Sequence, residues 1–131
     1  MSAAEVADTR LSAGRKADAL RAGIALLALV QDAATLDLAV TPYTGGLDVS
    51  VAVERWDVPA RERETQVLSS LMVISDILGR RPVIRRESED ALTLEISTVL
   101  FDTTVEIWAR FTTPEVMASA RWVLETATVA L

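Results

Sequence analysis

The sequence predicts an α+β domain with three helices and a four- or five-stranded, mainly antiparallel sheet. Helical spacing of apolar residues recurs near the start, middle and end of the chain. Between these segments, apolar residues occupy every second position, as they do in half-buried strands. The expected order is therefore one helix, one or two strands, a helix, three strands and a last helix. The length of 131 residues suits a single domain covering residues 1–131.

The first predicted helix covers residues 16 to about 34, after an Ala- and Ser-rich stretch, residues 1–12, expected to be a flexible lead-in. One side of this helix carries Leu20, Ile24 and Leu27, and the other carries Leu26, Leu29 and Val30. A helix that is apolar on both sides needs cover on both sides. Since the other helices have strong core stripes, we expect this helix to cover the second, half-polar face of the sheet or to lie at its edge.

The strands before the second helix are predicted with different clarity. Residues 47–54 alternate strictly, with Leu47, Val49, Val51 and Val53 on one side. Residues 36–41 alternate more weakly and could form a preceding hairpin strand, with residues 42–46 as the loop. The sheet has five strands if they do and four if they do not.

The second predicted helix runs from about Pro59 to Leu78, with Pro59 in its first turn and Gly79 as its stop. Its core stripe is Val67, Leu71, Ile74 and Leu78.

Three strands are predicted next, at about residues 82–87, 91–98 and 103–111, with turns at "ESED" and "LFD". The final helix begins at Thr113 and Pro114. Its core arc is Val116, Met117, Ala120, Val123, Leu124, Ala127 and Leu131.

The composition excludes several classes of function. A formal net charge of −6 disfavours general nucleic-acid binding. Because the chain has neither cysteine nor histidine, it lacks thiolate nucleophiles, zinc–thiolate sites and the usual proton shuttle. We therefore expect no metal, no cofactor and most simply no enzyme. The apolar run at residues 22–30 is too short to span a bilayer, so we expect a cytoplasmic protein without a membrane partner.

The segment "GRRPVIRRESED" gathers four arginines: Arg80, Arg81, Arg85 and Arg86. On an extended strand, Arg81 and Arg85 point one way and Arg86 the other, so the four arginines do not share one surface. A solvated edge strand is favoured over an anion-binding site at Arg81 and Arg85.

Carboxylates offer two weaker alternatives. Glu95 and Glu106 fall on the polar sides of neighbouring strands beside Trp108, where their pKa values could be driven apart for acid–base chemistry. The "ESED" segment could hold a hard cation, but its spacing favours a simple turn.

The tryptophans and the first helix lead to the functional expectation. Trp56, Trp108 and Trp122 all fall outside the predicted core stripes, and tryptophan is enriched in binding hot spots. We expect a non-catalytic protein–protein interaction module that forms a homodimer or docks on another protein. The expected contact residues are Leu26, Leu29, Val30, Trp108 and Trp122. The alternative is a small-molecule or anion-binding domain, including an enzyme that relies on carboxylates and arginine.

Overall fold

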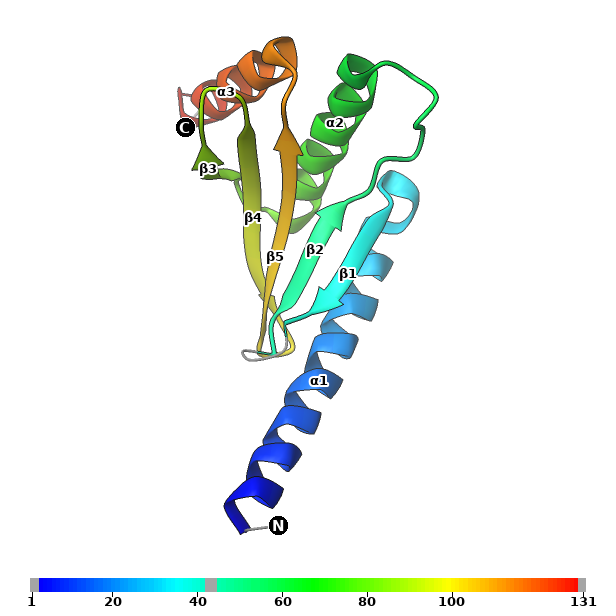
Figure 1. The fold of residues 1–131 in the computed structure, drawn as a ribbon, viewed down its shortest axis with the longest axis vertical. Helices are drawn as coiled ribbons and strands as arrows, with labels where there is room; N and C mark the ends of the chain where they lie inside the picture. The colour runs from blue at the N-terminus through cyan, green and yellow to red at the C-terminus, as the bar shows by residue number, and fades with distance from the viewer. Residues whose placement is uncertain (1–2, 42–44, 130–131) are drawn as a thin grey trace.

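A computed structural model describes the backbone of residues 3–41 and 45–129, and the side chains of residues 14–41 and 45–126. The fold has two layers, a five-stranded sheet and three helices that pack on one side of it (Figure 1). In chain order the elements are α1 (Ala3–Val30), β1 (Leu36–Val40), β2 (Leu47–Val51), α2 (Ala60–Leu78), β3 (Val83–Glu87), β4 (Leu92–Leu100), β5 (Thr103–Phe111) and α3 (Pro114–Val129). A short 3-10 helix, η1 (Gln31–Ala33), follows α1.

The strand order in the sheet is β1-β2-β5-β4-β3. The β1–β2 hairpin and the β3–β4–β5 meander are antiparallel, and β2 joins β5 as the parallel pair between them. The predicted α+β class, the element order and the mainly antiparallel sheet are confirmed. Since residues 36–40 do form a strand, the five-stranded alternative is the correct one.

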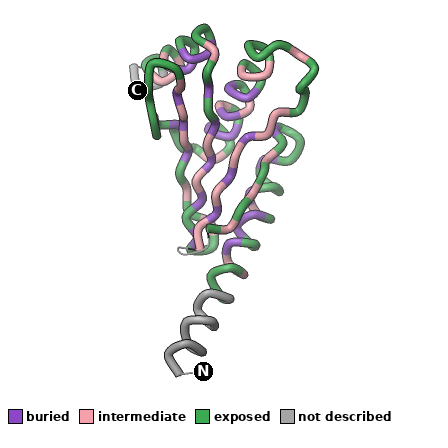
Figure 2. The backbone as a smooth tube through the Cα atoms, viewed as in Figure 1, coloured by how far each residue is buried: buried purple, intermediate pink, exposed green. Residues whose placement is uncertain are grey.

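The core lies between the sheet and the helices, because alternation buries one side of each central strand (Figure 2). Ile96 of β4 and Ile107 of β5 are fully buried there. The predicted stripe of α2 packs against them, with Leu71 and Ile74 inaccessible to solvent and Leu78 partly buried. In α3, the core residues are Val116, Met117 and Ala120, with Leu124 partly buried. Ala127 and Leu131 lie outside the described side chains.

The predicted helix stop at Gly79 is confirmed. Gly79 adopts a left-handed conformation (φ 63°), and its N–H donates to the carbonyl of Asp76. The N–H of Arg80 reaches back to the carbonyl of Ser75, which completes the C-terminal cap.

A carboxylate from α2 anchors the start of α3. Glu64 accepts hydrogen bonds from the backbone N–H groups of Thr112 (2.6 Å) and Thr113 (3.0 Å), just before α3 begins. Burial raises the pKa of the Glu64 carboxyl, but the hydrogen bonds from Thr113 and Thr112 outweigh burial and lower it overall. The ionised form of Glu64 therefore ties the ends of two helices together.

The first helix differs most from its prediction. It begins at Ala3 rather than near Lys16, so residues 3–12, predicted as a lead-in, belong to α1, whose N-terminal half extends past the end of the sheet (Figure 1). It packs on the same side of the sheet as α2 and α3, not on the half-polar side. A Cβ added to Gly23 would lie 3.0 Å from Leu38 Cδ2, which shows how closely α1 approaches β1. Within residues 3–41 and 45–129, no helix combines the length and the apolar character that a membrane span requires.

Candidate functional sites

The side of the sheet away from the helices is open and carries a ladder of polar side chains. On β4 and β5, Thr93 stands opposite Arg110, Glu95 opposite Trp108, and Ser97 opposite Glu106. The residues between them face the core, so strict alternation places every member of this ladder on the open face. The predicted half-solvated meander is confirmed, including the position of Trp108 on its polar side.

A β-bulge in β3 brings two arginines to this face. The register of β3 against β4 shifts between Ile84 and Arg86, which leaves Arg85 as the extra residue. Arg85 and Arg86 therefore line the same hollow of the open face. The prediction that these two arginines point to opposite sides is wrong, because it assumed a regular strand. The predicted edge position of this strand is confirmed, and all of its residues are exposed.

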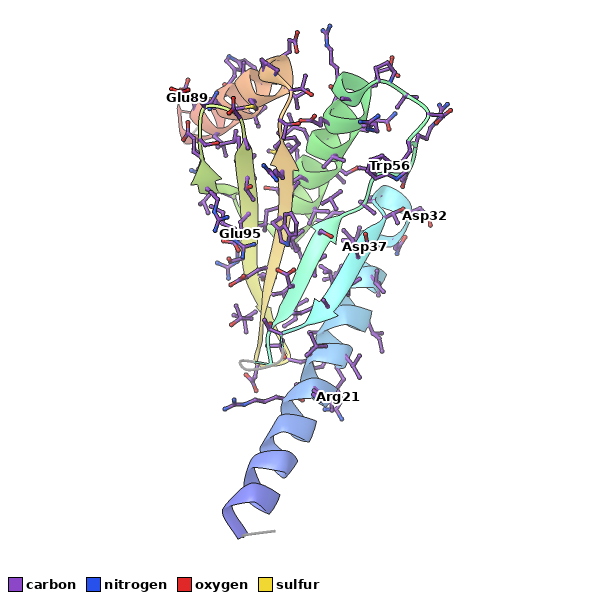
Figure 3. All side chains as sticks on the ribbon, in the orientation of Figure 1. Arg21, Asp32, Asp37, Trp56, Glu89 and Glu95 are labelled. Atoms are coloured by element: carbon purple, nitrogen blue, oxygen red, sulfur yellow. The ribbon has the colours of Figure 1, made fainter. Side chains whose placement is uncertain are left out.

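Arg85 sits between two carboxylates at the centre of the open face. Its guanidinium nitrogens lie 3.8 Å from Glu95 Oε1 and 3.8 Å from Glu106 Oε2. Glu95 projects from the middle of β4 (Figure 3). Burial raises the pKa of the Glu95 carboxyl, and repulsion from Glu106 raises it further, while Arg85 opposes both. The predicted proximity of the two glutamates is confirmed.

Trp108 is held in place from the neighbouring strand. Its indole Nε1–H donates to both carboxylate oxygens of Asp48 on β2, at 3.1 and 3.2 Å. This contact depends on the parallel pairing of β2 with β5, which sets Ser50 beside Trp108 and Asp48 beside Glu106. Because the indole donor is satisfied and the ring is only half-buried, Trp108 has a fixed position at the surface.

These side chains surround a shallow hollow of about 430 Å³. It is lined by Asp48, Arg85, Arg86, Ser88, Ala91, Thr93, Trp108 and Arg110. Of the predicted anion-binding pair, Arg85 lines this hollow and Arg81 does not. Sequence reasoning missed Arg86, whose position depends on the bulge, and Arg110, whose alternation with Trp108 was a usable signal.

A second candidate surface is the outward side of α1. Leu20, Ile24 and Leu27 are spaced four and three residues apart and are 62%, 69% and 46% exposed. We call these three residues the α1 stripe. Leu26 and Val30, predicted as contact residues, are instead buried in the core, so the structure exchanges the roles of the two sides of the helix. Leu29 is exposed, on the other flank.

Neither of the other two tryptophans lines the hollow. Trp122 projects from α3 and is 65% exposed, and Trp56 lies before α2 with Arg63 stacked over its ring at 5.3 Å. Trp108 and α1 lie on opposite sides of the sheet. The expectation that Trp108 or Trp122 lies close to the contact surface of α1 is therefore wrong for Trp108.

The acidic turn has a structural role. Glu87 pairs with Arg121 of α3 at 3.0 Å, and the Ser88 N–H donates to the Ala91 carbonyl to close the turn. Glu89 is exposed at its tip (Figure 3). Within the described part of the chain, no three carboxylates are grouped as metal ligands would be.

Comparison of the chain with models of known protein families, with curated protein sequences and with solved structures finds no match.

Proposed function

We propose that this protein is a non-catalytic protein–protein interaction module that forms a homodimer through the α1 stripe. The observation that carries the proposal is the exposure of three large aliphatic side chains in one row of a single helix. Single exposed apolar residues are ordinary on protein surfaces, but an aligned group of this kind is typical of an interaction site.

Burial of the α1 stripe would supply a substantial driving force. Full burial of a leucine or isoleucine side chain contributes roughly 1.5–3 kcal/mol, so even partial burial of three side chains in each protomer favours association. Positions Leu20, Ile24 and Leu27 follow the spacing with which helices pack against each other. The stripe therefore suits a helical partner.

The pattern of residues along α1 favours a second copy of this chain in antiparallel orientation. A twofold axis near Ile24 would set the two Ile24 side chains together and place Leu20 of each protomer against Leu27 of the other, because both residues lie on the same flank of the helix. The three members of the α1 stripe of one protomer thus meet those of the other in one antiparallel arrangement.

The test is the oligomeric state of the wild type and of two single variants. Ile24→Glu places a charge in the centre of the α1 stripe, where an antiparallel dimer would bury it twice. Val99→Glu is the matched control, since Val99 is 61% exposed on β4 and lies on the open face of the sheet. Molar mass by light scattering and sedimentation equilibrium should be measured over a wide concentration range.

We expect a concentration-dependent dimer for the wild type and for Val99→Glu, and a folded monomer for Ile24→Glu. The melting temperature of the wild type should also rise with protein concentration, as mass action requires. A wild type that stays monomeric throughout would reject the proposal. So would a dimer that both variants retain, because the contact would then lie elsewhere.

A further inference from the structure

The open face of the sheet has a cationic end with unused binding capacity. Arg86, Thr93 and Arg110 are aligned across β3, β4 and β5, so the two arginines flank Thr93 on the same side of the sheet. Arg85 is engaged by Glu95 and Glu106, whereas neither Arg86 nor Arg110 has an ion-pair partner among the described side chains. Two neighbouring guanidinium groups without a counter-charge favour an anion between them.

The hollow around this end also has hydroxyl groups and an aromatic wall. Thr93 and Ser88 can donate O–H groups to an anion, and Trp108 offers a ring whose own donor is occupied by Asp48. From these features we infer that the hollow binds a small organic anion. Arg86 and Arg110 would hold its carboxylate or phosphate group, and Trp108 would contact a planar apolar part.

The charges around the hollow select for a compact ligand. Asp48, Glu95 and Glu106 lie beside Trp108, and together with the net charge of −6 they repel an extended polyanion such as a nucleic acid. A volume of about 430 Å³ accommodates a molecule of the size of an aromatic phosphate. This inference concerns the open face and is independent of the α1 stripe.

The probes are phenyl phosphate and inorganic phosphate, added to the full chain at constant ionic strength. Binding should be followed by calorimetry and by the indole N–H signal of Trp108 in a ¹H–¹⁵N spectrum. We expect saturable binding of both probes below about 10 mM, with phenyl phosphate the tighter of the two because its ring contacts Trp108.

The double variant Arg86→Gln/Arg110→Gln should bind both probes with an affinity at least about tenfold lower, because it removes the charge-assisted hydrogen bonds. The matched control is Arg81→Gln, which removes the same kind of charge from the same segment outside the hollow and should change affinity less than about twofold. Trp108→Phe should reduce the difference in affinity between phenyl phosphate and inorganic phosphate. If that variant does not fold, a shift of the Trp108 signal in the wild type serves the same purpose.

Two results would overturn the inference. One is the lack of saturable binding by the folded wild type. The other is an equal loss of affinity in Arg81→Gln and in the double variant, which would indicate general attraction to positive charge. The molar-mass measurements on the α1 variants are separate from these titrations, so the two proposals can fail independently.

Discussion

Leu26 and Leu27 are adjacent leucines on α1 with opposite surroundings. Leu26 is fully buried against the sheet, whereas Leu27 is 46% exposed on the α1 stripe. The two residues have the same side chain and therefore the same intrinsic helix propensity, so only their surroundings differ. The comparison shows that one side of α1 holds the domain together and that the other side is exposed to solvent.

The same contrast recurs on β5, at Ile107 and Trp108. Ile107 points into the core, where contacts on every side stabilise it. Trp108 points to the open face, where hydrogen bonds to Asp48 hold it in place. Packing dominates the covered side of the molecule, and hydrogen bonds and charge dominate the open side.

The largest effect is expected from a matched pair of substitutions on α1. Leu26→Ala should lower the free energy of unfolding by about 2–5 kcal/mol, because it leaves a cavity in the core. Leu27→Ala should change it by less than about 0.5 kcal/mol, as exposed substitutions do. Urea unfolding in an Ile24→Glu background measures both without a contribution from dimerisation. Similar losses for the two variants would contradict the described placement of α1.

A smaller effect is expected where the helical layer is tied to the end of the sheet. Glu64→Gln should lower the free energy of unfolding by about 1–3 kcal/mol, because the two backbone N–H groups before α3 lose a charged acceptor. The pKa of Glu64 is lowered in the folded state, so its stabilising contribution is present above its ordinary pKa and is lost as the pH falls through the folded value. The difference in free energy of unfolding between Glu64→Gln and the wild type should therefore become smaller at acidic pH.

Glu62→Gln provides the control for Glu64, since Glu62 is exposed in the first turn of α2. Unfolding of the three proteins should be compared at neutral pH and at pH 3. A difference between Glu64→Gln and wild type that stays constant across this range would show that charge is not what anchors α3.

The smallest effect, and one of opposite sign, is expected on the open face at Glu95. Burial and Glu106 raise the pKa of Glu95 in the folded state. Above this raised pKa, ionised Glu95 lowers the free energy of unfolding. The lost stability returns as the pH falls from the folded pKa to the ordinary pKa of a glutamate. Glu95→Gln should therefore raise stability at neutral pH by up to about 1 kcal/mol and leave it unchanged in acid. If Glu95→Gln is instead less stable than the wild type at neutral pH, the contact of Glu95 with Arg85 outweighs the effect of burial.

Much of the fold could be predicted because its signals are local. Alternation identified β2, β4 and β5, a stripe of four apolar residues identified the buried side of α2, and Gly79 marked its end. Alternation also placed Glu95, Glu106 and Trp108 together on the polar side of the meander. Each of these features follows from the spacing of residues within one element.

The candidate sites could be predicted only in part. Alternation placed Arg85 and Arg86 on opposite sides, and the bulge reversed that result by adding a residue to the strand. A bulge depends on the fit between two strands, so one strand alone does not reveal it. Arg110 could have been found, since it alternates with Trp108 along β5.

The sequence by itself determined the α+β class, the order of the elements, the core stripe of α2, the core positions Val116, Met117 and Ala120 of α3, and the polar character of one sheet face. Periodicity is enough to predict these features because each element has one apolar side and one polar side. Only the tertiary structure decided which side of α1 is buried and which arginines meet on the open face. Because α1 is apolar on both sides, its periodicity has no preferred direction, and its contact with β1 and β5 selects Leu26 over Leu27.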